Sequence, residues 1–137
     1  LRAGVRHITI ANRTVAKAEA LVASHSALAA LQKAELLALS PQAVEGDFDV
    51  IINATASSLA GDAVPVPASV LRPGSLAYDM MYGPAAQGFL DWAQAHGAVA
   101  RDGLGMLVEQ AAEAFAIWRG VRPPSAQVLE ELRRTPH

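Results

Sequence analysis

The sequence predicts an α/β fold in which a doubly wound, mainly parallel sheet is followed by C-terminal helices. Short runs of apolar and β-branched residues alternate along the chain with longer helical patterns, which is typical of parallel sheets. Glycine and proline residues separate these segments. No internal repeat or low-complexity tract interrupts the alternation. The length of 137 residues favours a single domain.

The N-terminal half is expected to hold three strands. An alternating run from His7 to Ala11 predicts the first strand, and a helical pattern from about Thr14 to His25 follows it. The Ala/Leu-rich segment that comes next is ambiguous, with a short strand favoured near Leu36 to Leu39. Ser40-Pro41 is typical of an N-cap with proline in the first helical position. Phe48 to Asn53 has the pattern of a buried strand.

The C-terminal half alternates in the same way. Its expected strands are Leu76 to Met80 and Ala98 to Ala100, with a helix around Phe89 between them. A long helix from about Leu104 to Arg119 should follow. Ser125 is then expected to cap a final helix.

Composition excludes several classes of protein. The net charge of −2 argues against broad binding to nucleic acid or to membrane surfaces. The absence of cysteine excludes disulfides and thiolate metal sites, and it fits a reducing compartment. No apolar run reaches the roughly 18 residues of a membrane span. We therefore expect a cytoplasmic protein without a metal site; the oligomeric state stays open, with a homodimer as one alternative.

The turn after the first strand carries the first candidate site. In dinucleotide-binding folds the second strand of the sheet ends beside the adenosine ribose, where basic residues accommodate the 2′-phosphate of NADP. Here the turn offers Asn12, Arg13 and Thr14, and Lys17 follows one helical turn later. Arg13 can hold a phosphate through two parallel bonds, and the helix N-terminus adds positive potential. The alternative is a solvated turn with Thr14 as an ordinary N-cap.

Two motifs of small or pliant residues follow later strands. Asn53 to Ser58 is small and polar, so a cofactor backbone could approach it, and Thr55 could donate to a phosphate or ribose. A capped turn of small residues is the alternative. The segment 78–84 contains two tyrosines and two methionines, which suit a flat ring. For Tyr78 and Met81 the alternative is packing in the core.

A third motif lies between residues 101 and 110. Gly103-Leu104-Gly105 before a helix resembles the opening of a dinucleotide fingerprint, but Val108 stands where the third glycine belongs. The motif is therefore not expected to be a pyrophosphate loop. Two glycines at a helix start still permit the close approach of a ring. Gln110 borders the polar edge of this helix, where simple solvation is the alternative to ligand binding.

Four segments together resemble one known family. ANRTVAKAEAL, DVIINATASS, YDMMYGP and DGLGMLVEQAAEAFAIWRG, in this order and spacing, are similar to shikimate dehydrogenase from His7 into the last helix. The resemblance implies an NADP-dependent, two-domain oxidoreductase of aromatic amino-acid biosynthesis that reduces 3-dehydroshikimate to shikimate. The chain would then form a Rossmann-like cofactor domain.

The resemblance also implies roles for individual residues. The 2′-phosphate loop would be Asn12, Arg13, Thr14 and Lys17. Lys17 stands where relatives often carry arginine, which keeps the charge but loses the bidentate geometry. Met80 and Gly103 would line the nicotinamide, and Tyr82 and Gln110 would reach the substrate.

The chain departs from the family pattern at its start. The family's glycine-rich loop, its first strand and its substrate domain would precede Leu1, so the lysine and aspartate of proton transfer have no counterpart here and no catalytic residue is expected. We expect residues 1–137 to be an NADP-binding domain fragment, with helices 104–134 returning toward the substrate domain.

The missing first strand is the central one of a 3-2-1-4-5-6 order. The sheet should thus be incomplete at the N-terminus, and the strands on either side of the gap should each have an unpaired edge. Two alternatives stay open: an NAD-dependent quinate/shikimate dehydrogenase, and a non-catalytic dinucleotide-binding or interaction module.

Overall fold

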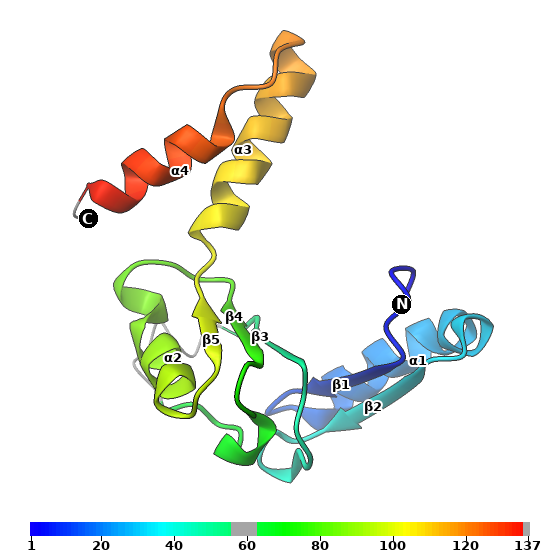
Figure 1. Cartoon of the computed structure of the whole chain (residues 1–137). Coiled ribbons are helices and arrows are strands. Elements are labelled where there is room, and N and C mark those ends of the chain that lie inside the picture. The colour runs from blue at the N-terminus through cyan, green and yellow to red at the C-terminus, as the bar shows by residue number, and fades with distance from the viewer. Residues whose placement is uncertain (56–62, 136–137) are drawn as a thin grey trace. The chain divides into compact units, whose positions relative to one another are not determined.

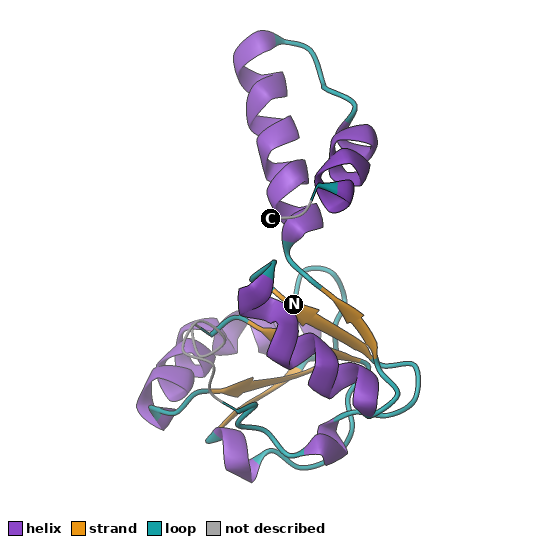
Figure 2. Cartoon of the chain, turned by 90° about the vertical axis from the view of Figure 1, so that its left-hand side faces the viewer, coloured by secondary structure: helices purple, strands orange, loops and turns teal. Residues whose placement is uncertain are grey.

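The computed structural model describes residues 1–55 and 63–135, and Figure 1 labels their elements. The chain forms two compact units, one of residues 1–47 and 65–70 and the other of residues 48–64 and 71–137. All strand pairs in the described ranges are parallel. Helices accompany the strands of both units (Figure 2). The expected α/β class with a parallel arrangement of strands is confirmed.

The first unit is a β-α-β arrangement with two short 3₁₀ turns. Its elements are β1 (His7–Ala11), α1 (Val15–Gln32), β2 (Glu35–Leu39), η1 (Pro41–Ala43) and η3 (Ala68–Val70). β1 and β2 pair in parallel, with His7 opposite Glu35. The helix continues past its predicted end at His25 because the Ala/Leu-rich segment has high helix propensity. It ends at Lys33, whose left-handed φ of 52° stops the helix.

The second unit holds a three-stranded parallel sheet with β4 at its centre. Its strands are β3 (Val50–Asn53), β4 (Leu76–Asp79) and β5 (Val99–Arg101), and α2 (Pro84–Ala95) packs against β4 and β5. Ala86, Phe89 and Ala93 form the buried stripe of α2. The prediction that β3 is buried is wrong: Val50 is 50% exposed and Ile52 61%, because β3 is an edge strand with an uncovered face.

The second unit ends in a pair of helices, α3 (Leu104–Arg119) and α4 (Ser125–Arg134). α3 has its predicted bounds, and Gly120 ends it with a left-handed φ of 70°. Ser125 is the first residue of α4 rather than its cap, because Pro124 occupies the cap position. Figure 2 shows the two helices running beside each other beyond the sheet of this unit. No helix within the described ranges could cross a membrane.

An arginine ties the α3–α4 connection to α3. Arg122 donates one hydrogen bond to Glu113 (2.6 Å) and one to Glu109 (2.7 Å). The hydrogen bond to Glu113 is the main cause that raises the pKa of Arg122 above its ordinary value, and the charges of both glutamates add to it. Since the group is exposed, this network orients the loop more than it stabilises the fold.

The strands group as the sequence predicts for a sheet without its central strand. Within residues 1–55 and 63–135, β1 pairs only with β2, and β3 pairs only with β4. Each of β1 and β3 therefore keeps one unpaired edge.

Candidate cofactor and substrate site

The β1–α1 turn is held by Asn12. Its Oδ1 accepts a hydrogen bond from the Thr14 N–H (2.9 Å), and its own N–H extends the ladder to Leu39 O (3.2 Å). Thr14 occupies the N-cap position of α1, as the alternative interpretation expected, but its side chain makes no capping hydrogen bond. Asn12 thus shapes the turn, and the Thr14 hydroxyl is left available at the start of the helix.

Arg13 and Lys17 provide the positive charge of this turn. Both residues are exposed, and within the described parts of the chain neither side chain has a hydrogen-bond or ion-pair partner. The first turn of α1 contains no acidic residue that would compete for them. The helix N-terminus adds unpaired N–H groups and the positive end of the macrodipole. This donor set fits a dianionic phosphate.

A second group of residues lies at the carboxyl edge of the sheet in the other unit. Asn53 and Asp79 end the neighbouring strands β3 and β4 and are register partners. The Asn53 amide donates to Asp79 Oδ2 (3.1 Å), while its Oδ1 accepts from the Thr55 N–H (3.2 Å) and hydroxyl (2.7 Å). The predicted cofactor residue Thr55 is therefore connected to the end of β4. The rest of its motif, residues 56–58, lies outside the described residues.

The end of β4 also meets the start of α3. Asp79 Oδ1 accepts the Met81 N–H (2.8 Å), and the Met81 carbonyl accepts the Gly103 N–H (2.8 Å). A Cβ on Gly103 would lie 2.6 Å from the Met80 carbonyl carbon and closer still to its oxygen. Gly103 has an ordinary φ of −81°, so the fold needs glycine there for space and not for conformation. The structure thus brings Met80 and Gly103 into contact.

The two predicted substrate residues are accessible. Tyr82 is 48% exposed and Gln110 is exposed on α3, and neither side chain has a hydrogen-bond partner within residues 1–55 and 63–135. Met80 is 41% exposed. Tyr78 and Met81 are partly buried, which agrees with the packing alternative for these two residues. Met80, Tyr82 and Gln110 are therefore free to meet a ligand.

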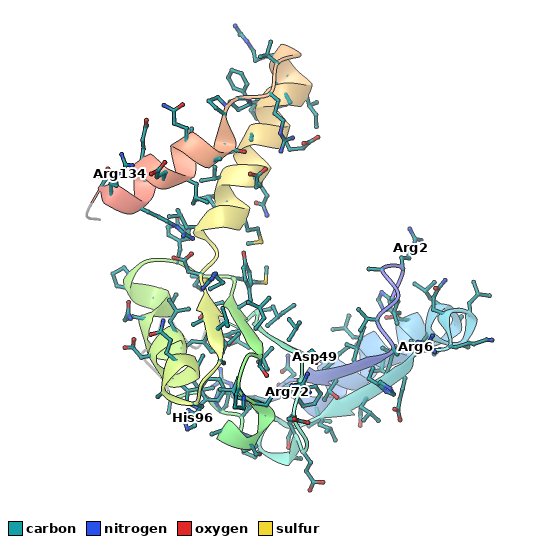
Figure 3. All side chains as sticks on the ribbon, in the orientation of Figure 1. Arg2, Arg6, Asp49, Arg72, His96 and Arg134 are labelled. Atoms are coloured by element: carbon teal, nitrogen blue, oxygen red, sulfur yellow. The ribbon has the colours of Figure 1, made fainter. Side chains whose placement is uncertain are left out.

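Charged residues at the opposite, amino edge of this sheet are paired with each other. Arg72, before β4, forms an ion pair with Asp49, before β3, and Figure 3 labels both. Ser75, which is buried, donates to the Phe48 carbonyl (2.7 Å) beside them. This edge is closed by its own contacts and contains no predicted site residue.

An apolar groove of about 320 Å³ lies between α3 and α4. Its lining comes from both helices and their connection: Leu107, Val108, Ala111, Ala112, Phe115, Pro123, Ser125, Val128 and Leu132. Gln110 is not among these residues. The groove is therefore separate from the candidate site.

Sequence reasoning placed Asn53 in a candidate motif without giving it a role of its own, and it missed Asp79 as a functional candidate. Asp79 is fully buried, yet it appeared in the sequence only as part of the tyrosine and methionine motif. The available signal was that one polar residue ends each of two neighbouring apolar strands, at the edge where such folds bind ligands.

The sequence of this chain is similar to those of known proteins. Residues 103–133 match the family described as Shikimate 5'-dehydrogenase C-terminal domain. A shikimate dehydrogenase (NADP(+)) of Verminephrobacter eiseniae is 78% identical over 133 residues, which are 97% of this chain and 46% of that relative. The chain thus spans about half the length of the curated relatives it matches.

Solved structures agree with the fold. An Ael1 enzyme from Pseudomonas putida has a TM-score of 0.79 and 46% identity, over 96% of this chain and 47% of that protein. Shikimate 5-dehydrogenase from Thermus thermophilus, in complex with NADP(H) and shikimate, has a TM-score of 0.69 and 27% identity. That match covers 97% of this chain and 47% of the Thermus protein.

Proposed function

We propose that this chain, which is similar over 97% of its length to a shikimate dehydrogenase (NADP(+)), is the NADP-binding part of an enzyme that reversibly reduces 3-dehydroshikimate to shikimate. The observation that carries this function is the cationic β1–α1 turn, which has no acidic residue in the first turn of its helix. A complete enzyme containing this chain should oxidise shikimate with NADP and should do so less well with NAD or with quinate. Activity with quinate and NAD, and none with shikimate and NADP, would contradict the assignment.

The 2′-phosphate is assigned to Asn12, Arg13, Thr14 and Lys17. Arg13 and Lys17 supply charge, the first N–H groups of α1 supply donors, and Asn12 holds the turn in place. A carboxylate at this position would instead favour the 2′-hydroxyl of NAD. The composition of the turn therefore supports NADP as the cofactor.

The ring and the substrate are assigned to the second unit. Met80 and Gly103, which contact each other, would line the nicotinamide, and Thr55 would donate to a phosphate or ribose. When bound, the reduced nicotinamide supplies the hydride for the substrate carbonyl. Tyr82 and Gln110 would orient shikimate through their free polar ends. No residue of this chain is assigned a role in proton transfer.

The domain arrangement is part of the same proposal. Residues 1–137 would form the cofactor domain, and helices 104–134 would return toward a substrate domain. The Arg133–Asp102 ion pair (3.6 Å) joins α4 to the residue just before Gly103.

Removing the polar ends of Tyr82 and Gln110 should impair the handling of shikimate only. In the complete enzyme, Tyr82→Phe and Gln110→Ala should each lower kcat/KM for shikimate by about two- to twelvefold, which corresponds to the 0.5–1.5 kcal/mol of one hydrogen bond. The dissociation constant of NADP should stay nearly unchanged. Steady-state kinetics and fluorescence titration of the same variants measure the two quantities.

Gln94→Ala on α2 serves as the control, because Gln94 is also an exposed helical glutamine in the same unit. It should leave both quantities at their wild-type values. If NADP binding collapses in the Tyr82 or Gln110 variants, or if shikimate kinetics do not change, these residues are packing elements.

The chain of 137 residues alone should not oxidise shikimate. It is assigned no proton-transfer group, and its β1 and β3 each keep an unpaired edge that should weaken cooperative unfolding. An absorbance assay at 340 nm with NADP, run beside a complete enzyme containing the chain, measures the activity. Turnover by the isolated chain above the no-protein background would refute this assignment.

A further inference from the structure

The buried carboxylate of Asp79 has no role in the ligand contacts assigned above. The residue is 0% exposed, although burying a charge is costly unless hydrogen bonds compensate for it. Its two oxygens accept from different donors, Oδ2 from the Asn53 amide (3.1 Å) and Oδ1 from the Met81 N–H (2.8 Å). The carboxylate therefore joins the end of β3 to the turn that follows β4.

Asn53 is held in one orientation by its neighbours. Its Oδ1 accepts two hydrogen bonds from Thr55, so its amide nitrogen must face Asp79. Its backbone carbonyl also accepts the Met80 N–H (3.0 Å). Asn53 and Asp79 thus form a matched donor and acceptor pair across β3 and β4.

The same pair fixes the backbone around Met80. Asp79 holds the Met81 N–H on one side, and the Met81 carbonyl accepts the Gly103 N–H on the other. Gly103 lies so close to the Met80 peptide that no side chain fits between them. A small rotation of the Met80 segment would therefore move the whole surface that Met80 and Gly103 present.

We propose that Asp79 is a positioning residue that, with Asn53, holds the Met80–Gly103 surface in the geometry required for hydride transfer. The role of Asp79 rests on the proposed function, because it acts through the two residues assigned to the nicotinamide. Sub-ångström placement of that ring controls the rate of transfer more than the affinity for the dinucleotide. The loss on breaking the pair should consequently appear in kcat.

Exchanging the two side chains gives a direct test in the complete enzyme. Asp79→Asn leaves one oxygen for two donors, and Asn53→Asp places two carboxylates against each other, so each single variant breaks the pair. In the double variant Asn53→Asp/Asp79→Asn, the new asparagine can accept from Met81 and donate to the new aspartate. That aspartate can still accept from Thr55. The net charge is conserved, and the hydrogen bonds described above between the pair, Thr55 and Met81 can all be formed again.

We expect each single variant to lower kcat by tenfold or more, with the dissociation constant of NADP within about threefold of wild type. The double variant should recover kcat to within about threefold of wild type. Asp91→Asn is the matched control, because Asp91 is exposed on α2 and, within the described part of the chain, its side chain accepts one hydrogen bond, from Gln87 (2.6 Å). It should leave kcat unchanged.

Three results would overturn the positioning role. The first is a wild-type kcat in both single variants. The second is a double variant in which kcat is not restored. The third is a destabilised single variant whose kcat returns to the wild-type value when the assay temperature is lowered below its Tm. If a single variant does not fold, the kcat of the double variant still tests the positioning role. A folded double variant with a low kcat contradicts that role. Absence of shikimate oxidation in the wild-type enzyme would instead refute the proposed function. In that case, the Tm values of the wild type, the two single variants and the double variant would still show whether Asn53 and Asp79 act as a pair.

Discussion

Replacing Arg13 with alanine should raise the KM for NADPH about tenfold or more in a complete enzyme that contains this chain. The variant loses a charge-assisted contact to the 2′-phosphate worth roughly 1.5–3 kcal/mol. The KM for NADH should barely change, because that cofactor carries a hydroxyl at the same place. Reduction of 3-dehydroshikimate with each cofactor, at constant ionic strength, measures both values.

Arg6→Ala is the matched control for the lost charge. Arg6 is exposed and precedes β1, whereas Arg13 follows β1, so the two arginines lie at opposite ends of one strand. Figure 3 labels Arg6 at the start of this strand. The control should change the KM for NADPH less than about twofold, since only long-range charge is lost. An equal loss with NADPH and NADH in Arg13→Ala would contradict the phosphate assignment.

The predicted bounds of helices and strands are most accurate where glycine or proline residues flank a periodic apolar pattern. α3 has its predicted bounds because Gly103 precedes its apolar stripe and Gly120 follows it. The end of α1 was placed too early, since residues 26–32 contain neither glycine nor proline to stop the helix. The prediction that β3 is buried was wrong for a different reason. An apolar strand pattern does not reveal which neighbouring element covers each face of the strand.

The candidate site was predictable only in part. The cationic turn at Arg13 and the polar ends of Tyr82 and Gln110 follow from residue type and from the place of each motif after a strand. The pairing of Asn53 with Asp79 depends on the register of β3 and β4, which spans the intervening loop and leaves no local pattern. The space constraint on Gly103 likewise comes from the distant Met80 peptide.

That constraint makes Gly103→Ala the most disruptive small substitution we expect in the second unit. The added Cβ would lie 2.6 Å from the Met80 carbonyl carbon, and this backbone cannot move away because the Met81 carbonyl accepts the Gly103 N–H. Overpacking of this kind costs about 1–3 kcal/mol, so the Tm of the complete enzyme should fall by roughly 2–12 °C. The displaced nicotinamide surface should also lower kcat by tenfold or more. Thermal unfolding and steady-state kinetics measure the two effects.

Gly105→Ala separates this steric effect from the general effect of adding a methyl group. Gly105 lies two residues further along, inside α3, and its added Cβ would meet only Leu129 Cδ2 at 3.8 Å, an ordinary contact. Because alanine is also the better helix former, by up to about 1 kcal/mol, this variant should be as stable as wild type or more so. Equal losses in both variants would mean that the start of α3 tolerates no substitution at all. An unchanged Tm and kcat in Gly103→Ala would mean that the Met80 peptide can yield, and that Gly103 does not set the nicotinamide surface.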